Sequence, residues 1–257
     1  MPDSDFTVTF LGVGGSCSAG DRRRVRYGSN TSCVLVRVGE RPIILDMGTG
    51  LVRLTGTAGN DVLRGADILL SHFHYDHIEG MPFFEPLFVD GRFDIYARPP
   101  ETSDVKTTIT NFFKDPYLPI KYNYYNAELH CHDLLTPSFT TATGIEVSTM
   151  PLNHPGGCTG YRIEYDGHVL VYLSDHEHTG DETATVQFSA GADLIIYDAH
   201  FTRAEYDTGR FIGWGHSHHE AGLKLAETAG AGRIAFTHHA IWRTDDELDE
   251  LEQQCKA

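Results

Sequence analysis

The chain of 257 residues is long enough for one sizeable α/β domain or two small ones, and its 40% hydrophobic and 22% charged residues are typical of a globular protein. This composition excludes a disordered chain, and no apolar run reaches the length of a membrane-spanning helix. Twenty Lys and Arg against 36 Asp and Glu give a formal charge of −16. Such a charge repels polyanions at long range, so extended nucleic acid is an unexpected partner.

The start of the sequence and the cysteines bear on the cellular compartment. The segment MPDSDFTVTF has neither the basic nor the apolar region of a secretion signal, and the five cysteines are scattered without a CxxC pair. We therefore expect a reducing, cytoplasmic environment and no disulfide framework.

Ten short runs rich in β-branched residues predict strands, in chain order at 6–10, 33–38, 42–46, 68–71, 93–97, 145–150, 161–165, 169–174, 194–198 and 233–237. Helical signals are clearest near the C-terminus, where SHHE at 217–220 and TDDE at 244–247 have the form of capping boxes. Gly230 supplies a stop for the first of these helices, and another helix is expected after Asp181.

Strand pairs in both halves, with helices between and after them, predict an α+β fold of two packed β-sheets with helices outside. No linker interrupts the chain, so one domain over 1–257 is expected. The segment 99–137 is rich in aromatic residues with weak periodicity. It is interpreted either as a cap over a pocket or as an excursion whose rings pack against the core, and it leaves a homodimer interface open. Its rings are those of Phe112, Phe113, Tyr117, Tyr122, Tyr124 and Tyr125.

The sharpest motif is SHFHYDH at 71–77, directly after an apolar run. Side chains on an extended segment repeat every two residues, so His72 and His74 point the same way and can bind one metal ion. Asp76 and His77 then turn toward a second position. Imidazole and carboxylate together suit Zn²⁺, and also Mn²⁺ or Fe²⁺, better than Ca²⁺ or Cu(I). The alternative is a set of surface histidines at a strand end.

An HxHxDH motif after an apolar strand resembles the signature of the metallo-β-lactamase superfamily. The resemblance covers nearly the whole chain, including LGVGGS at 11–16, GSNTSC at 28–33 and ILDMGTG at 44–50. It implies an αββα sandwich and two divalent metal ions. By resemblance, one ion is held by His72, His74 and His154, the other by Asp76, His77 and His238, and Asp175 bridges them. His238 is preferred to His239 because it directly follows the predicted strand.

A second motif points to one branch of this superfamily. GHS at 215–217, opening a helix, resembles the branch that holds RNase Z and the cyclic-phosphate phosphodiesterases of phosphonate breakdown, and Asp198 in IIYDAH matches the acidic residue of that branch. The resemblance implies that His216, oriented by Asp198, assists phosphoester cleavage. A helix N-terminus beside His216 would also favour an anion such as phosphate. The alternative is that Asp198 caps a helix and His216 is exposed.

Basic residues are concentrated after the first strand, at Arg22, Arg23, Arg24 and Arg26. In the family this loop lies near the active site, so Arg26 is the candidate contact for an anionic substrate, and a solvated basic loop is the alternative. The chain has neither a tRNA-gripping arm nor a broad basic surface, which disfavours tRNA processing.

These features predict a dinuclear metal-dependent hydrolase that cleaves a small phosphodiester, such as a cyclic nucleotide or cyclic sugar phosphate. Zinc is the expected ion, with manganese and iron open. Asp76 and Asp175 would orient the attacking hydroxide, and His216 would donate a proton to the leaving alkoxide. The alternatives are a lactone, thioester or β-lactam hydrolase with the same metal pair, and a non-catalytic scaffold.

Overall fold

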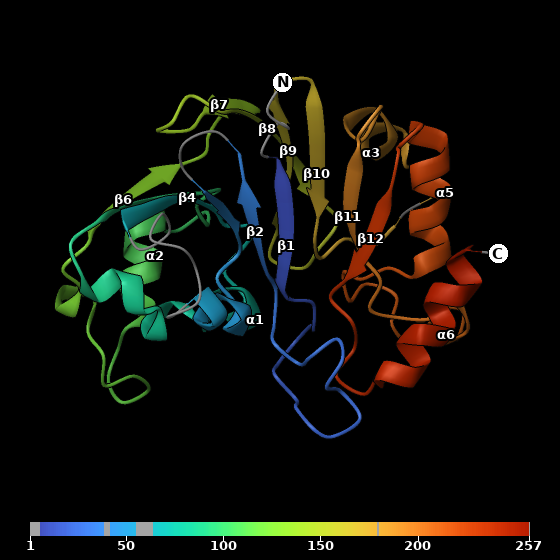
Figure 1. Ribbon diagram of the computed structural model, residues 1–257, viewed down its shortest axis with the longest axis horizontal. Helices are drawn as coiled ribbons and strands as arrows, with labels where there is room; N and C mark the ends of the chain where they lie inside the picture. Colours follow the sequence, from blue (N-terminus) through green and yellow to red (C-terminus); the bar gives the residue numbers. More distant parts are fainter. Residues whose placement is uncertain (1–5, 39–41, 55–63, 179, 257) are drawn as a thin grey trace.

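Two six-stranded β-sheets lie face to face in the computed structural model, which describes residues 6–38, 42–54, 64–178 and 180–256 (Figure 1). The first sheet has the order β1-β2-β3-β4-β5-β6 and consists of Thr7–Gly12, Cys33–Arg37, Ile43–Leu45, Gly65–Leu69, Arg92–Ala97 and Glu128–Asp133. The second has the order β12-β11-β10-β9-β8-β7 and consists, from β7 to β12, of Ser138–Thr140, Glu146–Leu152, Cys158–Tyr165, His168–Leu173, Leu194–Asp198 and Ile234–Thr237.

Both sheets are mixed. In the first, β1, β2 and β3 pair antiparallel and β3 to β6 pair parallel. In the second, β7 to β10 pair antiparallel, whereas β10, β11 and β12 are parallel. Parallel neighbours end at the same edge of a sheet, so the residues that follow these strands are brought together.

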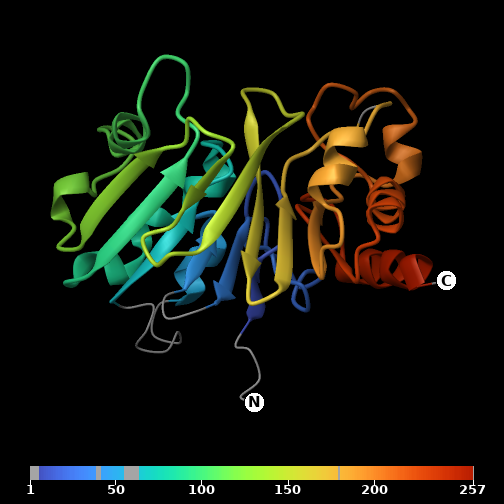
Figure 2. The same ribbon diagram turned by 90° about the horizontal axis from the view of Figure 1, so that it is seen from above.

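Helices cover the two outer faces, as Figure 2 shows from above. The first sheet carries α1 (Tyr75–Ile78), α2 (Val105–Phe112) and the 3₁₀ helices Thr49–Leu54, Met81–Phe83, Glu85–Phe88 and Tyr122–Tyr124. The chain after β10 forms α3 (Thr183–Phe188), α4 (Arg203–Tyr206), α5 (His219–Ala229) and α6 (Asp245–Lys256). In the described part of the chain, no helix is both long and apolar enough to span a bilayer.

Strand alternation divides the buried side chains among the layers. Val34 and Val36 point between the sheets, where they join Tyr161 and Tyr172 of the second sheet. Leu35 points to the outer face, where it joins the helical segments. Each fully buried aliphatic or aromatic side chain contributes about 1.5–3 kcal/mol to folding. The αββα arrangement predicted from the sequence is confirmed.

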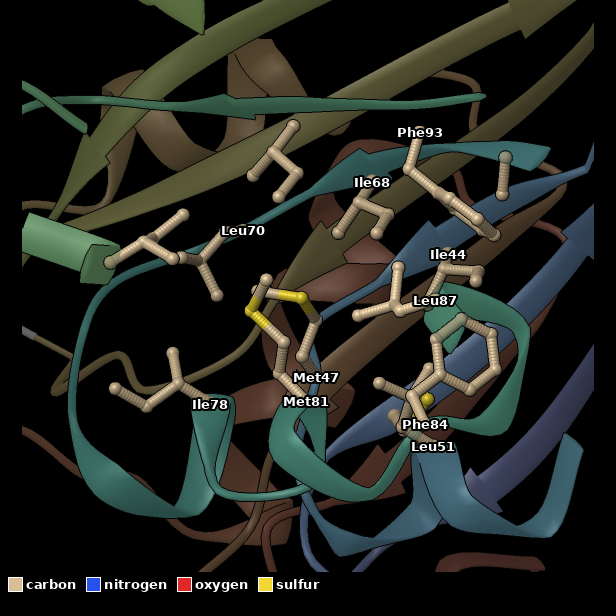
Figure 3. Packing of buried hydrophobic residues seen from close by; sticks show 14 of the residues in the cluster. Ile44, Met47, Leu51, Ile68, Leu70, Ile78, Met81, Phe84, Leu87 and Phe93 are labelled. Atoms are coloured by element: carbon tan, nitrogen blue, oxygen red, sulfur yellow. The ribbon is translucent and has the colours of Figure 1, made fainter. Parts of the chain in front are cut away.

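The outer core of the first sheet explains how the segment after β4 is anchored. Met47, Met81 and Phe84, from the irregular segments, pack against Ile44 and Ile68 of the sheet (Figure 3). The SHFHYDH segment is therefore anchored at both of its ends, by Ile68 before it and by Met81 and Phe84 after it.

All ten predicted strands are present, nine of them with shifted ends and β11 with the predicted ends. The sequence does not predict β6 and β7. β6 lies within the aromatic segment 99–137 and is an edge strand, where polar side chains meet solvent and blur the alternation. Phe113 is buried, and Phe112, Tyr122 and Tyr125 pack against the outer core of the first sheet. Packing against the core is therefore confirmed for these four rings.

Of the two predicted capping boxes, one is present. Thr244 and Glu247 exchange the expected hydrogen bonds at the start of α6. The box expected at Ser217 is wrong, because α5 begins one residue later with His218 as its N-cap. Buried Ser217 instead accepts a hydrogen bond from the Tyr197 hydroxyl (3.0 Å). Gly230 ends α5 in the left-handed conformation, as predicted.

Candidate metal centre

The ends of five strands bring the predicted site residues to one edge of the sandwich. His72 follows β4, His154 follows β8, Asp175 follows β10 and His238 follows β12, while Asp198 is the last residue of β11. The strands β8, β10, β11 and β12 run in the same direction, so their carboxyl ends share this edge. Residues separated by more than 160 positions therefore meet in one cluster.

The first group of donors contains His72, His74, His154 and Asp175, whose ligand atoms lie within 4.8 Å of one another. Nε2 of His154 is 3.0 Å from Nδ1 of His74 and 3.5 Å from Oδ2 of Asp175. Nε2 of His72 is 3.6 Å from the same carboxylate oxygen. These separations match those between ligands that share one ion about 2.0–2.2 Å from each.

The second group contains Asp76, His77 and His238. Oδ2 of Asp76 lies 3.0 Å from Nε2 of His238 and 3.4 Å from Nε2 of His77. The other oxygen of Asp175, Oδ1, lies 3.3 Å and 3.2 Å from the same two nitrogens. One oxygen of Asp175 thus faces each group of donors.

Two observations show that these residues fit divalent ions. Nε2 of His72 and Nε2 of His77 are buried and, among the described residues, have no hydrogen-bond partner, although a buried unpaired nitrogen is costly. A side chain at Gly15 would overlap the ring of His238, and one at Gly215 would overlap the ring of His154. The chain therefore leaves room for the imidazoles of His238 and His154, and leaves Nε2 of His72 and of His77 without a hydrogen-bond partner among the described residues.

The electrostatics of the cluster favour the ligand forms of Asp175, Asp76 and His72, whereas the facing carboxylates raise the pKa of His77 and of His238. Burial alone would raise the pKa of Asp175, but the imidazoles of His238 and His77 hold the pKa of that carboxyl well below its usual range. The pKa of Asp76 is likewise lowered by His77 and His238 against the effect of burial. Burial, assisted by His77, lowers the pKa of His72 well below its usual value. An ionised carboxylate and a neutral imidazole are the forms that bind metal.

Backbone strain is concentrated at this edge. Ser16, Asp46, Asp175 and His238 have φ values of 65°, 61°, 51° and 59°, in the left-handed region that few non-glycine residues adopt. Within the described ranges, Asp166 is the one other such residue. Ser16 also donates its backbone N–H to Oδ2 of Asp76 (2.8 Å). Strained conformations held by surrounding contacts are typical of functional sites.

Asp46 supports the second group and is a residue that sequence reasoning missed. Its Oδ2 lies 2.8 Å from Nδ1 of His77 and accepts hydrogen bonds from the hydroxyls of Ser71 (2.9 Å) and Tyr172 (2.7 Å). The carboxylate is fully buried. By holding Nδ1, it directs Nε2 of His77 toward Asp76 and Asp175. The available signal was its place directly after a strand in ILDMGTG.

The predicted pair of His216 and Asp198 is brought together beside the cluster. Nδ1 of His216 lies 2.7 Å from Oδ2 of Asp198, and both residues are buried. The ring of His200 stacks on that of His216 with 4.6 Å between centroids, and Nδ1 of His200 donates to the carbonyl oxygen of His238 (2.9 Å). The ring of His216 is thus fixed on two sides, with Nε2 as its remaining nitrogen.

Glu177 organises the loop before His216 and was also missed. Its carboxylate accepts the backbone N–H groups of Gly213 (2.9 Å) and Gly215 (2.8 Å) and the hydroxyl of Tyr206 (2.8 Å). The carbonyl oxygen of Gly215 in turn lies 3.0 Å from Nδ1 of His154. Glu177 therefore positions residues that touch both His154 and His216. Its place two residues after Asp175 was the only sequence signal.

The cavity at the cluster has a volume of about 510 Å³ and is lined by Ser16, Phe73, His74, Tyr75, Asp76, Asp175, His216 and His238. Two expectations concern residues around it. His238, and not His239, points into the cluster. Arg26 is not among the described residues that line the cavity, and its guanidinium pairs with Asp246 (2.8 Å) and Asp249 (2.6 Å) of α6.

The fold and the His/Asp cluster define the class of the protein, a metal-dependent hydrolase with the metallo-β-lactamase fold. The chain belongs to the β-lactamase superfamily, since the family described as the beta-lactamase superfamily domain matches residues 41–239.

Three known proteins illustrate the relationship. Ribonuclease Z of Methanosarcina mazei is 25% identical over 291 residues, covering 93% of this chain and 89% of its own. The metallo-β-lactamase fold protein YhfI from Bacillus subtilis has a TM-score of 0.70 at 21% identity, covering 96% of this chain and 91% of its own. A diphosphatase from the PhnP family has a TM-score of 0.67 at 19% identity, covering 95% and 90%. At these identities, the two solved structures establish the shared fold.

Proposed function

We propose that this protein is a dinuclear metal-dependent phosphodiesterase that acts on a small phosphodiester. The observation that carries the proposal is the placement of Asp175, whose two oxygens face two separate groups of imidazole and carboxylate donors. His72, His74 and His154 would hold one ion with Asp175. Asp76, His77 and His238 would hold the second on the other side of that carboxylate.

Two divalent ions bound there supply Lewis-acid stabilisation of a phosphoryl group and lower the pKa of water. Zinc is the expected metal, because imidazole dominates the donor set, and manganese and iron remain compatible with it. Asp46 and Gly215 contribute by fixing the orientation of two of the imidazoles.

His216 acts on the leaving group in this proposal. Asp198 holds Nδ1 of His216 at 2.7 Å and orients the ring, which leaves Nε2–H to donate a proton to the departing oxygen. The side chain of Asp198 is fully buried, so its negative charge is poorly screened by water and acts strongly on the imidazole. General acid catalysis of this kind contributes about 10²–10⁴ in rate.

A small substrate is favoured over RNA by the charge of the chain. The relative from Methanosarcina mazei is named for action on RNA, whereas the PhnP-family neighbour is named a diphosphatase. A formal charge of −16 repels a polyanion. The arginine-rich loop offers little compensation, because Arg23 and Arg26 are paired with aspartates. Both names refer to cleavage of a bond to a phosphoryl group, and the charge favours a short substrate.

The test is metal quantification combined with parallel hydrolysis assays on the metal-loaded protein. We expect about two equivalents of metal per chain and hydrolysis of bis(p-nitrophenyl) phosphate. A lactone and nitrocefin, assayed beside it, represent the alternative hydrolase class. Hydrolysis of either one without cleavage of the phosphodiester would overturn the proposal, and so would a stoichiometry well below one.

A further inference from the structure

The cavity at the cluster has a wall that the proposed chemistry does not use. Apart from the candidate ligands and His216, its lining consists of Ser16, Phe73 and Tyr75. Two of these three side chains are aromatic. The wall therefore offers ring faces and few groups for hydrogen bonding.

Tyr75 is the more accessible of the two rings. Its residue is 73% exposed, although it stands between His74 and Asp76 at the start of α1. Its ring packs against that of Phe112 at the end of α2, with 5.8 Å between centroids. Phe73, on the same stretch, packs against the outer core of the first sheet. Tyr75 thus presents a supported aromatic face at the rim of the cavity.

The lining also restricts the charge and polarity of the substrate. Among the described residues the lining contains neither Lys nor Arg, so metal ions and imidazoles would be its sources of positive charge. A phosphodiester carries one negative charge fewer than a phosphomonoester dianion and suits this lining better. Outside the imidazoles, the uncharged polar groups that the described residues offer here are the hydroxyls of Ser16 and Tyr75.

We propose that Tyr75 is the stacking surface for a planar aromatic group attached to the scissile phosphodiester, the biological form of such a group being a nucleobase. The inference rests on the proposed function and names its substrate class. Bases stack on aromatic side chains independently of their sequence identity, because every base has a π face. Phe112, at the end of α2, supports this surface.

The test compares two phosphodiester monoanions of equal charge, diphenyl phosphate and diethyl phosphate. Both are measured as competitive inhibitors of bis(p-nitrophenyl) phosphate hydrolysis and, independently, by calorimetric titration of the metal-loaded protein. We expect diphenyl phosphate to bind about 5- to 150-fold more tightly, which is the range for stacking on one ring. Equal binding of the two ligands would overturn the inference.

Variants of Tyr75 test whether its ring causes the preference for diphenyl phosphate over diethyl phosphate. Tyr75→Ala and Tyr75→Leu should abolish the preference, while Tyr75→Phe should keep it within about threefold. Tyr165→Ala is the matched control, because Tyr165 is 39% exposed at the opposite end of β9 from the cluster. A preference that survives both Tyr75→Ala and Tyr75→Leu contradicts the proposal. Calorimetry measures binding even if the protein cleaves no diester. A failure of the proposed function can therefore be distinguished from a failure of the stacking proposal.

Discussion

Oδ2 of Asp198, at the end of β11, and Nδ1 of His216, which lies 18 positions later and just before α5, are 2.7 Å apart. The contact orients a buried imidazole from the side opposite the cavity. Because Nδ1 of His216 is held, the direction of its other ring nitrogen, Nε2, is also defined. Loss of this pair should change turnover without changing the metal content.

His216→Ala should lower kcat for bis(p-nitrophenyl) phosphate by about two to four orders of magnitude, because a general acid is removed. The bound metal, measured by atomic emission, should stay at the wild-type level. His130→Ala is the control, since His130 lies on the exposed edge strand β6. Wild-type turnover in His216→Ala would remove the assignment.

Asp175→Asn should reduce the metal content to about one equivalent or less, because the neutral amide replaces the carboxylate that faces both groups. Wild-type protein should gain thermal stability when zinc is added, since the ion binds the folded state. The variant should gain much less. Two retained equivalents with an unchanged zinc-dependent shift in Tm would contradict the bridging position of Asp175.

Asp46→Asn tests whether the Asp46 carboxylate orients the imidazole of His77. The carboxylate lies 2.8 Å from Nδ1 of His77, and partners of this kind typically account for 10- to 100-fold in metal affinity. We expect a loss of that order at one of the two sites, measured by competition with a chelating dye. Asp94→Asn is a useful comparison, because Asp94 is equally buried but pairs with Arg92 on β5. Equal affinities in wild type and Asp46→Asn would argue against the role.

Glu177→Gln should lower kcat by about 10- to 100-fold, because the amide cannot accept hydrogen bonds from Gly213, Gly215 and Tyr206 at once. The loop that carries Gly215 would then hold His154 and His216 less firmly. Glu164→Gln is the control, since Glu164 pairs with Arg162 on an exposed part of β9. Unchanged kcat and an unchanged pH profile in Glu177→Gln would show that this carboxylate has no positioning role.

Asp245→Asn tests the anchoring of the basic loop on α6. Burial alone would raise the pKa of Asp245, but the backbone N–H groups of Arg26, Tyr27 and Val25 lower it overall. At pH 7 the variant should lose about 1–3 kcal/mol of unfolding free energy.

The effect of Asp245 should depend on pH. A carboxyl whose pKa is lower in the folded state stabilises the protein above its unfolded pKa, about 3.9, and loses that contribution as the pH falls through the folded value. The difference in unfolding free energy between wild type and Asp245→Asn, measured by urea unfolding, should therefore become smaller below about pH 4. Asp246→Asn, at the adjacent exposed position, should show little change. If this difference in unfolding free energy became larger at acidic pH, the stabilising role of the Asp245 carboxylate would be refuted.

Local patterns were sufficient for most strands and for the histidine motif. Runs such as CVLVR and HVLVYL alternate between two apolar faces because both faces of each sheet are buried, so periodicity identifies them. The edge strand β6 has no such pattern, because its polar side chains meet solvent. Ser217 has the form of an N-cap in sequence, but its burial next to Tyr197 redirects its hydroxyl.

The candidate ligands could be named from the sequence because each follows a strand, and the resemblance to a family ordered them along the chain. The supporting carboxylates of Asp46 and Glu177 could not, since their partners at Tyr172 and Gly213 are distant in sequence and identified by packing alone. The aromatic face of Tyr75 likewise exists because α2 brings Phe112 beside it. Sequence by itself determined which chemical groups are present and which strands carry them. Tertiary structure decided their directions, because hydrogen bonds and burial act between segments that only folding brings into contact.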